Sequence, residues 1–65
     1  MKVTVTYLGK KQTVQLGGGC VKDLLKQMNI NPETVLVGKN GEIVLETENL
    51  KPGDRIEFIR VISGG

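Results

Sequence analysis

Apolar and polar residues alternate along the start of the chain. Residues 2–8 carry apolar side chains at every second position, and many of them are β-branched. Residues 12–16 alternate again after a polar, glycine-containing turn at residues 9–11. Because this pattern is typical of half-buried strands, the first sixteen residues predict a hairpin.

The period changes after a run of three glycines. Apolar side chains at Val21, Leu24, Leu25 and Met28 follow the i, i+3, i+4, i+7 spacing of one helix face. Pro32 cannot continue a helix, and two asparagines close to it favour a turn. We therefore expect one short helix that begins at Val21.

The second half of the chain contains three further extended segments. Residues 34–39 and 42–45 flank Asn40-Gly41, a strong hairpin signal because both turn positions need positive φ. A turn at residues 51–54 contains proline and glycine, and residues 55–62 then form a strongly β-forming run. These segments predict a second hairpin and a final strand.

The order strand, strand, helix, strand, short strand, strand predicts one α+β domain over residues 1–65. An amphipathic helix needs a sheet face to cover, and the final strand has no hairpin partner of its own. Pairing it in parallel with the first strand gives a mixed four- to five-stranded sheet with one helix across one face, the β-grasp arrangement. The predicted core comprises Val3, Val5, Val14, Leu16, Leu24, Leu25, Met28, Ile43, Leu50, Ile56 and Phe58.

Length and composition limit the classes of function. A chain of 65 residues has no volume for a deep substrate cleft, and its apolar runs are too short for a membrane span or a signal peptide. We therefore expect a cytoplasmic protein without membrane contact. The sequence has no histidine and one cysteine, Cys20, so we expect no metal site and no catalytic residue.

Charge and aromatic content argue against a nucleic-acid partner. The net charge is +2, and one tyrosine and one phenylalanine offer little surface on which bases stack. The glycines at 17–19 lack the Lys-Ser/Thr pair of a phosphate loop, and we interpret them as a flexible connection. Cys20 is interpreted as a small apolar filler that replaces a better helix cap.

The final residues, Ser63-Gly64-Gly65, follow the apolar strand directly. Glycine has no Cβ, so this tail can thread a narrow channel in a partner's active site. The carboxylate of Gly65 could attack the α-phosphate of ATP if a partner enzyme aligned the two, which would give an acyl-adenylate. A frayed end or a chance pair of glycines is an alternative explanation, and the dipeptide alone is a weak motif.

Residues just before the tail form a candidate docking surface. The alternation that buries Ile56 turns Ile59 and Val61 toward the sheet face that the helix leaves uncovered, where an apolar patch would bind a partner. Arg60 could meet an acidic patch or an ATP phosphate, although an ordinary surface arginine is the simpler interpretation. The predicted docking set is Phe58, Ile59, Arg60, Val61, Ile62 and Ser63.

The whole chain resembles the ThiS/MoaD family of ubiquitin-like sulfur carriers, and is closer to the thiamin-biosynthesis branch. The resemblance rests on residues 35–44 (VLVGKNGEIV), 50–54 (LKPGD) and 56–65 (IEFIRVISGG). It implies that a ubiquitin-activating-like enzyme uses ATP to adenylate the carboxylate at the Gly64-Gly65 end, which then becomes a thiocarboxylate. That group would donate sulfur to a synthase, most simply for thiamin thiazole, while the carrier catalyses nothing and binds no cofactor.

Three alternatives stay open from the sequence. The chain could be the small subunit of a molybdopterin synthase, a modifier that is conjugated to protein lysines through Gly65, or a β-grasp binding module with an idle tail. The glycine-rich loop at residues 17–20 and the positive net charge both depart from the family pattern. The charge bears on partner identity, because docking surfaces are matched in charge.

Overall fold

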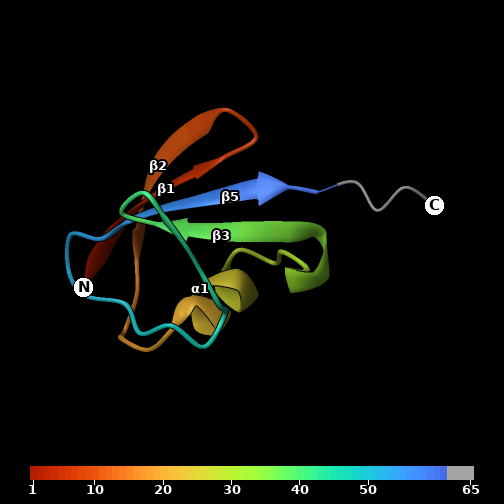
Figure 1. The fold of residues 1–65 in the computed structure, drawn as a ribbon. Helices are drawn as coiled ribbons and strands as arrows, with labels where there is room; N and C mark the ends of the chain where they lie inside the picture. The colour runs from red at the N-terminus through yellow and green to blue at the C-terminus, as the bar shows by residue number, and fades with distance from the viewer. Residues whose placement is uncertain (62–65) are drawn as a thin grey trace.

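The computed structural model describes residues 1–61, which form five strands, one α-helix and one short 3-10 helix (Figure 1). In chain order they are β1 (Lys2–Tyr7), β2 (Lys10–Gln15), α1 (Val21–Gln27), η1 (Pro32–Thr34), β3 (Val35–Lys39), β4 (Glu42–Val44) and β5 (Arg55–Arg60). Within residues 1–61, no helix has both the length and the apolar character needed to cross a membrane.

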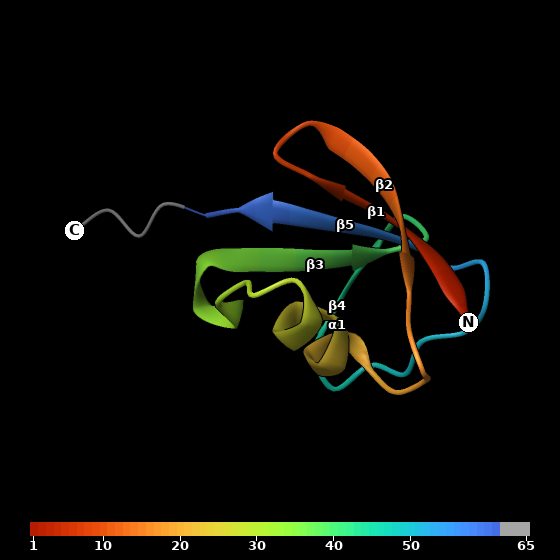
Figure 2. The same cartoon turned by 180° about the vertical axis from the view of Figure 1, so that it is seen from behind.

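The strands form one mixed sheet in the order β2-β1-β5-β3-β4. The central pair, β1 and β5, is parallel, with Thr4 opposite Arg55, and every other neighbouring pair is antiparallel. Figures 1 and 2 show that α1 lies against one face of this sheet and leaves the other face open. The predicted β-grasp arrangement, with the final strand inserted beside the first, is therefore confirmed.

The core lies between α1 and the covered face of the sheet. Strand alternation supplies its sheet side, and the helix supplies the stripe predicted from its spacing. The buried apolar residues are Val3, Val5, Leu16, Val21, Leu24, Leu25, Val35, Val37, Leu50, Ile56 and Phe58. Two predicted members, Val14 and Met28, are only partly buried at the edge of this cluster.

The prediction of Ile43 as a core residue is wrong. Its side chain is 64% exposed, while its neighbour Val44 packs against the core. Successive residues of a strand point to opposite faces, and Val44 pairs with the buried Val37. Only one residue of the Ile43-Val44 pair can face the helix, and the register with β3 decides which.

The first turn is shorter than predicted. Residues 9–11 were expected to form it, but β1 and β2 pair as far as Tyr7 opposite Lys10, which leaves Leu8 and Gly9 as the connection. Both residues have positive φ, 53° and 76°, as a two-residue hairpin turn requires. Leucine is unfavourable in that conformation because its Cβ crowds the backbone.

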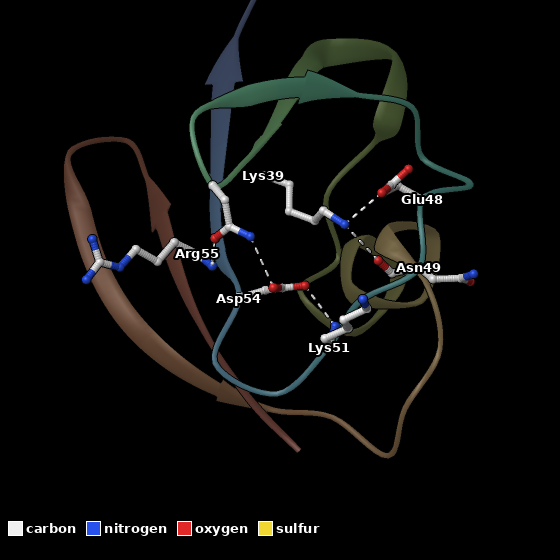
Figure 3. Close-up of polar contacts among 7 residues, drawn as sticks. Lys39, Glu48, Asn49, Lys51, Asp54 and Arg55 are labelled. Atoms are coloured by element: carbon white, nitrogen blue, oxygen red, sulfur yellow. Dashed lines mark hydrogen bonds and ion pairs between the residues drawn. The ribbon is translucent and has the colours of Figure 1, made fainter.

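A polar cluster holds the start of β5, as Figure 3 shows. The backbone N–H of Lys51 donates to Asp54 Oδ2 (2.8 Å), and Asn40 Nδ2 donates to Asp54 Oδ1 (3.2 Å). The backbone N–H of Arg55 donates to Asn40 Oδ1 (3.0 Å). Asn40 therefore forms the β3–β4 turn with its backbone, at a φ of 52°, and joins that turn to the entry of β5 with its side chain.

Asp54 is the one buried charged residue in the part of the chain that the structure describes. Its burial raises the pKa, but the hydrogen bonds from Lys51 and Asn40 and the positive charges of Lys39 and Lys51 outweigh that effect. The net result is a pKa below the ordinary aspartate value. The ionised form of Asp54 therefore stabilises the folded state.

We predict that Asp54→Asn lowers the free energy of unfolding at pH 7 by about 1–3 kcal/mol, because it removes a charged acceptor from the part-buried hydrogen bond of the Lys51 N–H. In the wild type, the stabilisation by ionised Asp54 is fully present above the unfolded-state pKa of about 3.9. It is lost as the pH falls through the lowered pKa of the folded state. Urea unfolding from pH 7 to pH 2 should therefore show a shallower acid limb in the variant. Two parallel stability curves would contradict this role of the carboxylate.

We also predict that Leu8→Asn raises the free energy of unfolding by about 1 kcal/mol, because asparagine tolerates the left-handed backbone that leucine disfavours. The matched control is Leu45→Asn, since Leu45 is also exposed and has no positive φ. The control should change stability by less than about 0.5 kcal/mol. Equal effects of the two substitutions in thermal unfolding would refute the strain at Leu8.

Candidate functional site

The root of the C-terminal tail lies at the end of the central strand. β5 runs between β1 and β3 and ends at Arg60, and the next residue, Val61, donates its N–H to the carbonyl oxygen of Thr34 (2.9 Å). Thr34 is itself held by its N–H and Oγ1, which both donate to the carbonyl oxygen of Asn31 (3.0 and 2.7 Å). The chain is therefore fixed in position up to Val61.

Four of the residues predicted to function lie beyond this point. Gly64 and Gly65, predicted to be adenylated and converted to a thiocarboxylate, are outside the described residues. Ile62 and Ser63, predicted to contact a partner, are outside them as well. The structure therefore defines the place from which the tail starts, and the roles of these four residues stay predictions.

The structure divides the remaining docking residues between two faces. Ile59 lies on the open face, 41% exposed and directly opposite Leu36, which is 46% exposed. Val61 follows at the end of β5 and is 37% exposed. Arg60 is exposed but pairs with the buried Val35, so its side chain leaves the sheet on the helix side, away from Ile59.

The inclusion of Phe58 in the docking set is corrected. Only 3% of Phe58 is exposed, and its ring packs edge-on against Tyr7 at 6.2 Å in the core. It shares the covered face with Ile56 because the two are separated by one residue of a strand. A residue buried in this way contributes to stability and makes no surface for a partner.

Two apolar residues of the open face were missed by the sequence analysis. Leu36 stands between the buried Val35 and Val37, and Ile43 precedes Val44. Together with Ile59 they form what we call the apolar patch: Leu36, Ile43 and Ile59, on β3, β4 and β5. A sequence signal existed, because an apolar residue out of phase with the core must lie on the opposite face of the sheet.

A shallow hollow of about 300 Å³ opens on this face beside the patch. Gly38 lies within it, Ile43 and Ile59 line it on the apolar side, and Arg55 and Glu57 line it with opposite charges; Thr4, Thr6, Lys11, Gly41, Glu42 and Ile56 complete the lining. An exposed apolar patch with polar surroundings is a typical protein-docking surface. The hollow is too open and too shallow to shield a reaction from water.

The glycine loop and Cys20 have a structural role. The carbonyl oxygen of Gly19 accepts the N–H of Leu50 (3.0 Å), so the connection is held at its end. Cys20 donates its N–H to Asp23 Oδ2 (3.1 Å), and its thiol lies 3.6 Å from the same oxygen. The backbone hydrogen bond first, and then the thiol, lower the pKa of Asp23. Asp23, the third residue of α1, thereby makes the half of a capping box in which its side chain accepts the N–H of the N-cap residue Cys20.

The polar residues far from the tail also stabilise the fold. The ammonium group of Lys39 lies 2.7 Å from Glu48 Oε2, and this hydrogen bond raises the pKa of Lys39 (Figure 3). Lys39 also donates to the carbonyl oxygen of Asn49 (3.3 Å), and this hydrogen bond connects β3 to the loop between β4 and β5. Among residues 1–61, no three acidic, cysteine or histidine side chains are grouped to hold a metal ion.

Comparison with known proteins connects this geometry to a family. The ThiS family model matches residues 4–65. An uncharacterized protein of Archaeoglobus fulgidus is 34% identical over 68 residues, and the sulfur carrier protein TtuB of Thermus thermophilus is 26% identical over 65 residues. In both cases the match covers all of this chain and all of the relative.

A solved structure agrees with the sequence match. The crystal structure of the thiamine biosynthesis protein ThiS from Geobacter metallireducens superposes with a TM-score of 0.66 at 31% identity, covering 95% of this chain and 99% of that one. The family model, the relatives and the ubiquitin-like β-grasp fold point the same way. This chain belongs to the ThiS family.

Proposed function

We propose that this chain is a cytoplasmic sulfur carrier and that the carboxyl group of Gly65 is its working group. The observation that carries the proposal is that the ThiS family match runs to residue 65 and so includes the terminal Gly64-Gly65. The name of the Thermus thermophilus relative, a sulfur carrier protein, supports the same class of function.

The proposed chemistry has two steps, both catalysed by a partner. In the first, the Gly65 carboxylate attacks the α-phosphate of ATP, an acyl–phosphate bond forms, and pyrophosphate leaves. In the second, a sulfur nucleophile attacks the carbonyl carbon, AMP leaves, and a thiocarboxylate is formed. A ubiquitin-activating-like enzyme binds the ATP and aligns the reactants, whereas this chain supplies the carboxylate and a docking surface.

The geometry of the tail root suits that division of work. Val61 is held beside Thr34 at the end of the central strand, and four residues follow it in the sequence. Four residues reach at most about 14 Å when fully extended. An enzyme that acts on Gly65 must therefore come close to the end of β5, where Ile59 and Leu36 offer apolar surface.

The proposed acceptor of the sulfur is a thiazole synthase of thiamin biosynthesis. Support comes from the Geobacter metallireducens protein, which is 31% identical over almost the whole of both chains. Molybdopterin synthesis and conjugation to protein lysines use the same adenylate. They differ in where the activated carboxyl or its sulfur goes, so a product measurement separates them.

We predict that deletion of Gly65 abolishes thiocarboxylate formation, because it removes the carboxyl group that the activating enzyme positions. The wild type, incubated with ATP, a sulfide source and a lysate of its host, should gain the mass of one oxygen replaced by one sulfur in intact-mass spectrometry. The matched control is Gly17→Ala, since an added Cβ at Gly17 meets no atom within 4 Å. This control should form the thiocarboxylate as the wild type does.

The other outcomes separate the alternatives. Adducts on other proteins that depend on Gly65, without a thiocarboxylate, would replace the carrier function by a modifier function. Transfer of the sulfur to a molybdopterin precursor and not to a thiazole would change the acceptor. Equal behaviour of the deletion variant and the wild type would refute the function of the tail.

A further inference from the structure

Gly38 occupies a position where the fold does not need glycine. It lies within β3, and its φ is not among the positive values. A Cβ built at this position would lie 3.8 Å from its nearest neighbours, the carbonyl oxygens of Glu42 and Glu57, which is ordinary van der Waals contact. An added Cβ therefore fits, and both alanine and valine suit a strand better than glycine does.

What glycine provides at residue 38 is space on the open face. Gly38 lies between Ile43 on β4 and Glu57 on β5, in one row of paired residues across the sheet. Any side chain here would rise between these two and into the hollow of about 300 Å³ that Gly38 helps to line. Glycine inside a strand often marks a site of close approach by another molecule.

The hollow lies close to the root of the tail, within the area that a docked enzyme can cover. Gly38 is opposite Glu57, and Val61 follows Glu57 by four residues, which is about 13 Å along a strand. The chain beyond Val61 spans at most about 14 Å. A protein that encloses Gly65 and ATP and packs against the root of the tail has to reach back only about 13 Å along β5 to cover the hollow.

The lining indicates which kind of group enters the hollow. Ile43 and Ile59 offer apolar walls, and the nearby charges are of both signs, Lys11 and Arg55 against Glu42 and Glu57. A single charged group would gain one attraction and meet one repulsion there, whereas an apolar group would displace water from the isoleucines. An apolar anchor within a polar rim is the usual form of an interface hot spot.

We propose that the hollow over Gly38 receives one bulky apolar side chain, aliphatic or aromatic, from the activating enzyme. This inference rests on the proposed function, because it takes the enzyme that adenylates Gly65 as the occupant. It makes Gly38 a determinant of partner specificity that acts by the absence of a side chain.

The test is to fill the hollow while the fold is kept. Gly38→Ala and Gly38→Val should raise the KM for the carrier in ATP–pyrophosphate exchange by the activating enzyme of the same genome. We expect the KM to rise a few-fold in Gly38→Ala and about tenfold or more in Gly38→Val. The kcat should stay unchanged because binding, and not the chemical step, is affected.

The matched control adds a valine elsewhere on the sheet. Gln12 is exposed and pairs with the buried Val5, so its side chain lies on the opposite side of the sheet from the hollow. Gln12→Val should leave the KM at the wild-type value. Thermal unfolding of the three variants should show melting temperatures at or above that of the wild type, which separates lost docking from lost folding.

Each outcome decides between the two proposals. If the wild type supports exchange and Gly38→Val has the same KM, the anchor in the hollow is refuted and the carrier function stands. If Gly38→Val weakens only binding to the sulfur acceptor, or only self-association measured by sedimentation, the occupant is that protein or a second copy and the inference is overturned. If the wild type itself supports no exchange, the proposed function fails first.

Discussion

The parallel pairing of β1 with β5 is the constraint on which the rest of this structure depends. The last strand of the chain lies in the middle of the sheet, with Thr4 opposite Arg55, although the helix and the second hairpin come between β2 and β5 in the sequence. Backbone hydrogen bonds from Gly53 to Lys2 (2.8 Å) and from Thr4 to Asp54 (2.9 Å) hold this entry. A shift of this β1–β5 pairing by one residue would move Ile56 and Phe58 from the core to the open face of the sheet.

The same register determines what the molecule shows to a partner. Because Ile56 and Phe58 face the helix, Glu57 and Ile59 must face the open side of the sheet. The buried Asp54 and the bridging Asn40 act at the start of β5, at the opposite end of the strand from the tail. Their effect on function is therefore indirect: they set the register that places the tail root and the apolar patch on adjacent surfaces.

Local chemistry was enough to predict most of the fold. Alternation identified the strands, the i, i+3, i+4, i+7 spacing identified α1, and Asn40-Gly41 identified the second hairpin, because each signal depends only on neighbours in sequence. The failures share a different cause. Whether Ile43 or Val44 is buried, and whether Leu8 belongs to a strand or a turn, depends on pairing with another strand, which no local pattern contains.

The candidate site was predictable to a similar extent. Ile59 follows from alternation, but Leu36 and Ile43 join it only once β3 and β4 are paired beside β5. The role of Asp23 at the helix start was also missed, because the expected cap was a side chain at residue 20 and the contact comes from three residues later.

The two faces of the sheet are under different physical demands. On the covered face every side chain must fit the helix, so a change of volume is costly. On the open face the side chains of the apolar patch meet solvent in the free protein, and the buried Gly38 gives β3 no side chain, so the costs are exposed apolar surface and a weaker strand. An exposed apolar patch that brings no benefit to the core is best explained by contact with another molecule. In this chain, recognition of a partner therefore belongs on the open face and not in the core.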